Sequence, residues 1–236
     1  MTSSLRDLKV YTTYPHSCSY LEGQEATTLF VDPRTPVDGR LYSQLSALGF
    51  RRSGSHLYRP HCSKCNACIP ARVPVRRFQP RRSQRRTWNR NQDVQVEQLE
   101  SIATDEYFEL YRRYIEDRHR DGDMYPPLRD QYESFLSDVW GVTEYYRLEL
   151  LGQLAAVAVV DRLEDGLSAV YTFFEPQLHR RSLGTYSVLW QLRRAARNGL
   201  DYLYLGYWIK QCQKMSYKIQ YRPLELYING RWVDLL

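Results

Sequence analysis

The sequence of 236 residues predicts an α+β protein whose C-terminal half is built on a mixed β-sheet. Two observations support this fold class. First, three strand-like segments follow one another across short turns that contain glycine, at 142–150, 153–163 and 167–174. Second, they are followed by a basic loop at 179–185, a helix that ends at Asn198-Gly199, and a strand at 200–207. A hydrophobic content of 43% with 25% charged residues excludes a disordered chain.

The N-terminal part is expected to be irregular up to residue 37, apart from a short strand at 27–31. A helix is predicted at 38–48, because Leu41, Leu45 and Leu48 share one face and Gly49 suits the position after its end. The elements expected next are short strands at 50–52 and 55–58, a strand at 71–75, a basic helix at 81–91, a strand at 94–99, and helices that begin at Thr104 and near Asp130. A terminal hairpin is expected to turn at Asn229-Gly230.

The chain is predicted to divide where its basic character ends, between residues 93 and 103. We expect residues 1–98 to form a smaller region that holds the cysteines and most of the clustered arginines. Residues 99–236 are then the larger domain.

The order of the C-terminal elements is typical of the acyltransferase fold of N-acetyltransferases. In that fold two neighbouring strands splay apart, and a loop of the form Q/R-x-x-G-x-G/A offers backbone N–H groups to a phosphate-bearing substrate. Arg181-Ser182-Leu183-Gly184 gives the first half of this pattern, whereas Tyr186 replaces its final small residue. The sequence therefore predicts an N-acetyltransferase-like sheet with flanking helices.

Arginines are concentrated in one segment of the chain. Between Arg72 and Gln92 there are eight arginines and no acidic residue, although the whole chain has a net charge of only +6. Arginine binds phosphate with two parallel hydrogen bonds and stacks on bases. This segment predicts contact with a nucleic acid, and a solvated charged face is the alternative interpretation.

Three cysteines, Cys62, Cys65 and Cys68, form a C-x-x-C-x-x-C motif. Thiolates at this spacing bind one metal ion from a tight turn, and a fourth ligand is available from Cys18, His16 or His61. The spacing does not separate a structural zinc site from an iron–sulfur cluster. Three reduced cysteines in a packed loop are the alternative.

Long stretches of the chain resemble the bacterial aspartate/glutamate leucyltransferases, relatives of the eukaryotic arginyl-tRNA–protein transferases. The resemblance rests on PHSCSYLEGQEATTLF (15–30), on GDMYPP (122–127), and on residues 49–75, 78–86, 107–119, 156–176, 180–191 and 203–227. The eukaryotic relatives place their cysteines differently: this chain has Leu21 and Ile69 where they have cysteine. Their metal or cluster ligands therefore cannot be transferred residue by residue.

The resemblance implies transfer of leucine from leucyl-tRNA to the N-terminal α-amino group of proteins that begin with Asp or Glu. The new N-terminal leucine then marks the protein for degradation. No cofactor is expected for the chemistry, because an aminoacyl ester is already activated and a fraction of α-amino groups is neutral at cytosolic pH. The residues expected to bind tRNA are Arg72, Arg76, Arg77, Arg81, Arg82, Arg85, Arg86, Arg180, Arg181 and Gly184.

Two further tasks are assigned to residues as hypotheses. Reading the acidic side chain of the acceptor requires a cation, and Lys210, Lys214 and Lys218 would share one face of a helix. Arg76 and Arg77 are the other candidates for this role, and a basic helix face in water or on tRNA is the alternative interpretation of the lysines. Handling the proton of the amine is assigned to Asp161, Glu175 and Tyr171, near the ends of the central strands.

Three other functions fit parts of the sequence. An arginyl donor would use the same chemistry, an acetyl-CoA-dependent N-acetyltransferase would use the same fold, and a zinc-ribbon nucleic-acid-binding module would explain only the cysteines and arginines. The longest clean apolar run, Leu154–Val160, is far too short to cross a membrane, and the N-terminus lacks an apolar signal sequence. We therefore expect a cytoplasmic protein without a membrane partner.

Overall fold

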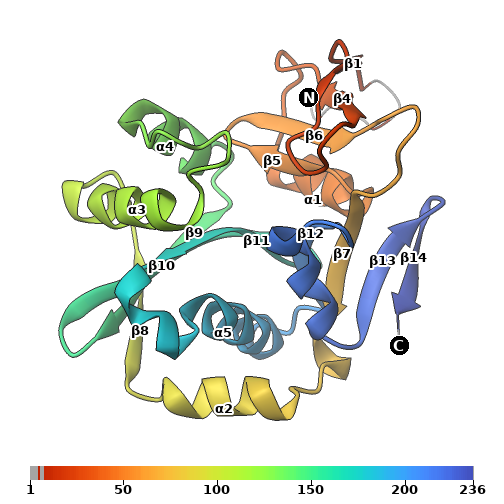
Figure 1. The fold of residues 1–236 in the computed structure, drawn as a ribbon. Helices are drawn as coiled ribbons and strands as arrows, with labels where there is room; N and C mark the ends of the chain where they lie inside the picture. The colour runs from red at the N-terminus through yellow and green to blue at the C-terminus, as the bar shows by residue number, and fades with distance from the viewer. Residues whose placement is uncertain (1–4, 6–7, 236) are drawn as a thin grey trace.

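An eight-stranded mixed sheet forms the centre of the computed structural model, which describes residue 5 and residues 8–235 (Figure 1). Its strand order is β14-β13-β7-β12-β11-β10-β9-β8. The strands are β7 (Ile69–Pro74), β8 (Val94–Leu99), β9 (Thr143–Leu150), β10 (Gln153–Arg162), β11 (Gly166–Phe174), β12 (Tyr202–Trp208), β13 (Leu224–Ile228) and β14 (Arg231–Leu235).

The predicted antiparallel run of β9, β10 and β11 is confirmed. Strand β10 is buried from Ala155 to Asp161, because helices cover both faces of the sheet. One face packs against α5 (Leu183–Arg197), with α2 (Arg82–Arg90) lying beyond it, and the other packs against α3 (Asp105–Arg118) and α4 (Arg129–Leu136) (Figure 1). The predicted helix near 130–139 thus ends at Leu136.

Strands β11 and β12 splay apart as the fold prediction requires. Their parallel pairing covers only Gly166–Ser168 against Tyr202–Tyr204, and a bulge follows in β12 before Gly206. Helix α5 connects the two strands. The order of strands, loop, helix and strand confirms the predicted acyltransferase-like α+β fold.

Strand β7 comes from the N-terminal part of the chain but lies inside the large sheet. It pairs antiparallel with β12 on one side and with β13 on the other. Ala71 and Val73 are buried there, so this strand contributes to the main core. Strand β8 forms the far edge of the same sheet. The division at residue 98/99 stays a prediction, although two strands that precede it share the sheet with the later ones.

The N-terminal lobe contains a second sheet of four strands in the order β1-β4-β6-β5 and the helix α1 (Figure 1). Asp38 accepts a hydrogen bond from the N–H of Leu41 (2.8 Å) and caps α1, which confirms the helix expected at 38–48. The lobe packs onto the large sheet through Leu163 and Tyr204. Its elements are β1 (Val10–Thr12), β2 (His16–Ser17), β3 (Glu25–Ala26), β4 (Thr28–Val31), α1 (Gly39–Ala47), β5 (Arg51–Ser53) and β6 (His56–Pro60).

Short helical segments lie between the larger elements from residue 8 onward: the 3-10 helices η2 (Val75–Arg77), η3 (Pro176–Arg181) and η4 (Tyr217–Gln220), and the single-turn helix α6 (Gln213–Ser216). None of the helices in the part of the chain that the structure describes is long and apolar enough to cross a membrane.

Candidate functional site

Helix α5 begins beside the splayed strands. After η3, Ser182 adopts a left-handed backbone conformation (φ 54°), and α5 starts without a side-chain cap. Gly184 lies against Phe174: a Cβ at this position would come within 3.2 Å of the ring. The first turn therefore presents backbone N–H groups at the positive end of the helix dipole, an arrangement that suits a phosphate.

Helix α2 connects the predicted basic segment to this loop. Arg81, Arg82, Arg85 and Arg86 are exposed, and none of them has a carboxylate within ion-pair distance among the described residues. At the other end of α2, Arg90 donates a hydrogen bond to the carbonyl of Arg180. Arg82, Arg85 and Arg86 thus lie on a helix, with Arg81 at its N-cap, and the other end of this helix contacts the loop before α5.

Arg181 is held in place beside α2. Its guanidinium binds the carboxylate of Asp93 (2.7 Å) and also donates to the carbonyl of Arg90 (2.8 Å). Arg180, in contrast, is exposed. Of the two loop arginines that were expected to bind tRNA, Arg180 is therefore the one whose charge faces solvent.

Three other arginines expected to bind tRNA are engaged in ion pairs. Arg72 is buried, bonds to Glu225 (2.7 Å), and lies between the rings of Tyr202 and Trp232. Arg76 pairs with Asp201 (3.4 Å), and Arg77 pairs with Asp234 (2.8 Å). The linear sequence hid these partners, since all of them lie more than a hundred residues later in the chain. Arg72 in particular stabilises the β7–β13 pairing and has no free face for a phosphate.

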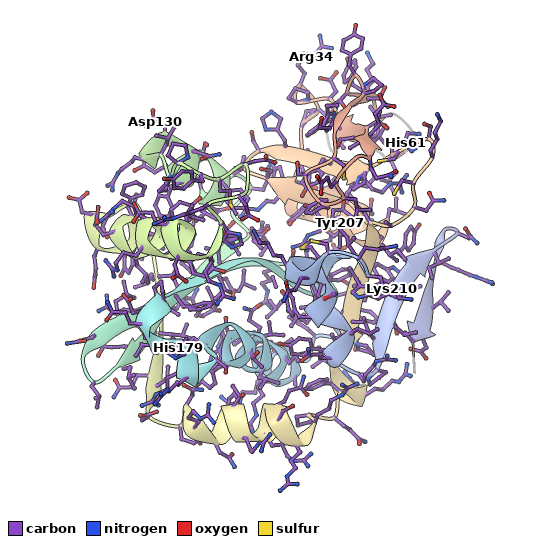
Figure 2. The ribbon with its side chains drawn as sticks, viewed as in Figure 1. Arg34, His61, Asp130, His179, Tyr207 and Lys210 are labelled. Atoms are coloured by element: carbon purple, nitrogen blue, oxygen red, sulfur yellow. The ribbon has the colours of Figure 1, made fainter. Side chains whose placement is uncertain are left out.

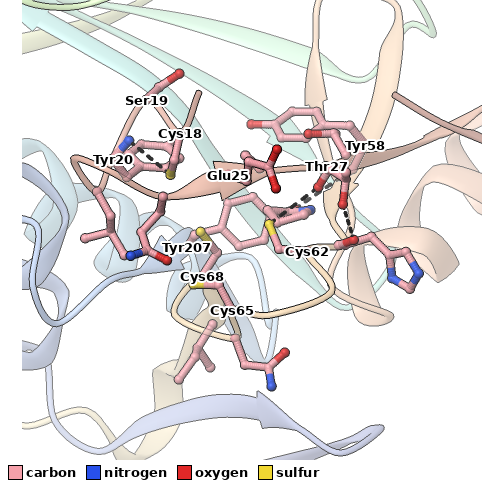
Figure 3. Close-up of a pocket in the computed structure, with 18 of the residues that line it drawn as sticks. Cys18, Ser19, Tyr20, Glu25, Thr27, Tyr58, Cys62, Cys65, Cys68 and Tyr207 are labelled. Carbon is pink, nitrogen blue, oxygen red and sulfur yellow. Dashed lines mark hydrogen bonds between the residues drawn. The ribbon is translucent and has the colours of Figure 1, made fainter. Parts of the chain in front are cut away.

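Four cysteines line one cavity of about 980 Å³ between the N-terminal lobe and the end of β12 (Figure 3). Cys62, Cys65 and Cys68 come from the loop between β6 and β7, and Cys18 comes from the β2–β3 hairpin. Burial, and then the negative charges of the other thiolates, raise the pKa of Cys68 to about 12. The cysteines expected to act together therefore do gather at one place.

The chemistry of this set fits zinc or an iron–sulfur cluster, because thiolate sulfur is the preferred ligand of both. In the described residues, however, no three His, Cys, Asp or Glu side chains are spaced to hold a metal ion. Metal binding would have to draw the sulfur atoms together.

Asp161 is buried completely and is bound on both carboxylate oxygens. Arg52 donates to it through Nε (2.6 Å) and Nη2 (2.9 Å), and the hydroxyls of Tyr42 and Thr143 donate at 2.6 and 2.9 Å. With no oxygen open to a cavity, this carboxylate cannot receive a proton from a substrate amine. The geometry assigns Asp161 to attaching the N-terminal lobe to β10, in place of the catalytic role expected from its position.

Glu175 lies far along the sheet from Asp161, whereas Tyr171 is the β11 partner of Val159, two residues before Asp161. Glu175 follows β11 and pairs with Arg113 (2.9 Å), and its backbone N–H bonds to Ala155 at the opposite end of β10 from Asp161. Six strand residues separate these ends, or about 20 Å. The hydroxyl of Tyr171 is buried without a hydrogen-bond partner, and burial raises its pKa well above the usual value. The three residues do not form one catalytic group.

The three lysines do not share one helix face, contrary to the expectation from their spacing. Helix α6 spans only Gln213–Ser216, so Lys210 precedes it and Lys218 lies in η4. Lys210 is exposed (Figure 2), and Lys214 is exposed and pairs with Asp121. Lys218 alone is buried, with 2% of its surface exposed.

Arg51, which was not among the residues expected from the sequence, reaches from β5 into the gap between the splayed strands. Its guanidinium donates to the hydroxyl of Ser168 (2.7 Å) and to the carbonyl of Ala169 (2.6 Å). It passes close to Gly206, where a Cβ would lie 3.4 Å from Nε. A glycine inside a predicted strand is a signal for such a close approach, and here it was available in the sequence.

Solved structures with a similar fold include FemX, with a TM-score of 0.47 and 10% identity over 84% of this chain and 79% of that one. Another is L-PGS from Bacillus licheniformis, with a TM-score of 0.45 and 11% identity over 60% of this chain and 45% of that one.

Sequence relatives are far more similar. The "Aspartate/glutamate leucyltransferase" proteins of Pseudomonas fluorescens and Pseudomonas entomophila are each 59% identical over 233 residues, which is 99% of this chain and 99% of theirs. The family description "Arginine-tRNA-protein transferase, N terminus" matches residues 16–86, and "Arginine-tRNA-protein transferase, C terminus" matches residues 106–228. Together with the splayed sheet and the unpaired arginines of α2, these matches show that the chain belongs to the arginine-tRNA-protein transferase family and, within it, groups with the aspartate/glutamate leucyltransferases.

Proposed function

We propose that the protein transfers leucine from leucyl-tRNA to the N-terminal α-amino group of proteins that begin with Asp or Glu. The added leucine marks these proteins for degradation, and the enzyme acts in the cytoplasm. The observation that carries the proposal is a set of exposed arginines in the N-terminal half of α2, without a carboxylate partner among the described residues, on a helix whose other end contacts the loop before α5. The proposal is also supported by relatives that are similar over their full length and are named for this activity.

The reaction is the aminolysis of an ester. The neutral amine of the acceptor attacks the carbonyl carbon of the leucyl ester, the new C–N bond forms, and the C–O bond to the terminal ribose breaks. The proton lost by the amine ends on the released ribose hydroxyl, so no external reactant is needed. Such a step depends mainly on holding the two substrates in contact and on stabilising the developing oxyanion.

The fold offers a place for each substrate. The arginines of α2 suit the phosphates of the tRNA, and the first turn of α5 with Arg180 suits its 3′ end. The gap between β11 and β12 lies next to this turn and can receive the acceptor from the side of the N-terminal lobe. The ester and the amine would then meet between the splayed strands.

A transfer assay tests the proposal. The purified protein is incubated with labelled leucyl-tRNA, arginyl-tRNA or acetyl-CoA and with peptides that begin with Asp, Glu, Ala or Lys. We expect label to move only from leucyl-tRNA and only to the Asp and Glu peptides. Transfer from arginyl-tRNA or acetyl-CoA would instead establish one of the other donors. Binding of tRNA without any transfer would reduce the protein to a nucleic-acid-binding module.

We also propose a structural metal, either zinc or an iron–sulfur cluster, bound by Cys18, Cys62, Cys65 and Cys68. Its support is that four thiols from two separate segments line one cavity. Bound metal would tie the β2–β3 hairpin to the loop before β7 and stabilise the N-terminal lobe.

A further inference from the structure

Lys218 is a buried lysine that has no anionic partner among the described residues. Its ammonium contacts the sulfur of Met215 (3.4 Å) and lies 4.9 Å from the centre of the Tyr217 ring. No carboxylate of the described residues lies within ion-pair distance of it. Lysine is almost never fully buried unless it is paired, because an isolated charge in the interior costs several kcal/mol.

Arg51 supplies a second positive charge at the same place. It too lacks a carboxylate within ion-pair distance among the residues described, and its hydrogen-bond acceptors, the Ser168 hydroxyl and the Ala169 carbonyl, are neutral. Burial, and then the charge of Arg51, lower the pKa of Lys218 to about 7. The two side chains are therefore close enough to repel each other.

Two neighbouring cations with no carboxylate beside them form a site that lacks an anion. An anion placed between them would relieve their repulsion and form charge-assisted hydrogen bonds with both. Two side chains that contact Lys218 are themselves partly open to solvent: Tyr217, next to it in the chain, is 42% exposed, and Met215 is only half-buried. To reach the ammonium of Lys218, a carboxylate would have to displace the Met215 sulfur that now contacts it.

We propose that Arg51 and Lys218 form the subsite that binds the side-chain carboxylate of the acceptor's N-terminal Asp or Glu. This assignment rests on the proposed function and identifies the residues that read its acceptor. A carboxylate is favoured over a tRNA phosphate, because the phosphate-facing arginines lie on α2, across the large sheet from β5 (Figure 1). Arg51 also lies in the gap between β11 and β12, where the acceptor amine must arrive.

The test uses two variants of the full chain, Lys218→Met and Arg51→Gln, with Lys9→Met and Arg40→Gln as controls at exposed positions. Each protein is assayed with peptides that differ only in their first residue, Asp against Asn and Glu against Gln. We expect the wild type to favour Asp over Asn in kcat/KM by about 10- to 100-fold, as befits a charge-assisted contact. Both variants should lose most of this ratio, and both controls should keep it.

Three measurements make the outcome decisive. Thermal unfolding verifies that each variant is folded, and Lys218→Arg should restore part of the Asp preference because it restores the charge. Direct binding of the fluorescent Asp and Asn peptides, without tRNA, tests the subsite even if no leucine is transferred. It therefore separates failure of this assignment from failure of the proposed function. The affinity for leucyl-tRNA should be unchanged in both variants.

An unchanged Asp/Asn ratio in Lys218→Met and Arg51→Gln would overturn the proposal. So would a loss of leucyl-tRNA binding with the ratio preserved, because the two cations would then bind a phosphate of the tRNA. If Lys218→Met fails to fold, the Asp/Asn ratio of Arg51→Gln decides the question.

Discussion

Arg52 and Asp161 form a two-point ion pair with both side chains almost completely buried. The pair joins β5 of the N-terminal lobe to β10 at the centre of the large sheet, at distances of 2.6 and 2.9 Å. Tyr42 and Thr143 donate to the same carboxylate, and Arg52 also donates to the carbonyls of Phe135 and Ser137. Every polar group of the pair thus has partners, which is the condition under which a buried ion pair is tolerated.

Removal of either partner should destabilise the protein strongly. In Arg52→Met, the carboxylate of Asp161 remains buried without its counter-charge, and we expect a loss of about 3–5 kcal/mol in the free energy of unfolding. Urea unfolding measures this loss. As a control, Arg112→Met breaks the exposed pair with Glu109 and should cost less than about 1 kcal/mol. Equal losses in the two variants would show that the buried pair does not hold the lobe to the sheet.

The sequence predicted the fold best where local signals were sufficient. Strand β10 is a single apolar run between turns, and α5 follows a basic loop and ends at Asn198-Gly199. Such local signals predict where a helix or strand lies in the sequence, but they do not predict which elements it packs against or pairs with. The insertion of β7 between β12 and β13 depends on pairing between segments more than a hundred residues apart, and no periodicity reports it.

The candidate site was predicted less well for the same reason. Asp161 had the position expected of a proton acceptor, but its partner Arg52 lies 109 residues earlier in the chain. The lysines were placed on a helix by their spacing, whereas the chain forms only one helical turn there. The four cysteines line one cavity, three of them because they are close in sequence, whereas their role as metal ligands stays a prediction.

The exposed arginines of α2 should contribute directly to tRNA affinity. Arg85→Ala and Arg86→Ala each remove a charge that has no carboxylate partner in the described residues. Each change should weaken binding and reduce the slope of log K against log salt by about one unit. Filter binding at several salt concentrations measures both effects. Arg113→Ala serves as the control. Arg113 lies on α3, on the other face of the sheet, and pairs with Glu175, so its removal should leave the slope unchanged.

If the salt slope of Arg85→Ala and Arg86→Ala equals that of the wild type, α2 is a solvated face. The tRNA path would then have to be sought elsewhere on the surface.

Metal should be lost when a cysteine of the cavity is replaced. We expect Cys62→Ser and Cys65→Ser to contain less zinc or iron than the wild type and to unfold at a lower temperature, because a bound metal contributes directly to folding free energy. Elemental analysis and thermal unfolding check both points. Cys212→Ser is the matched control, since Cys212 does not line the cavity. A wild-type protein that contains neither metal when purified anaerobically would refute the metal proposal.

Recognition of the acceptor carboxylate should weaken as the pH rises through about 7. Burial, and then Arg51, lower the pKa of Lys218 to about 7, while the neighbouring Cys212 acts on this pKa in the opposite direction. The form that binds a carboxylate is the protonated one, so its fraction falls above pH 7, and a bound carboxylate raises the pKa again. The Asp peptide should therefore lose affinity with rising pH, until the pKa of the complex is passed.

The ratio of Asp-peptide to Asn-peptide binding isolates this effect from other titrations. Both peptides carry the same α-amino group, whose pKa of about 7.7–8.0 also falls in this range, and its contribution cancels in the ratio. Fluorescence anisotropy gives the ratio of the two binding constants directly. The ratio is measured from about pH 6 to about pH 9, which extends about one unit beyond these pKa values on each side. In the wild type it should decrease with pH, and in Lys218→Met it should be low and constant. A ratio that falls equally in Lys218→Met would assign the pH dependence to another group, and Lys218 would then not be the residue that reads the acceptor.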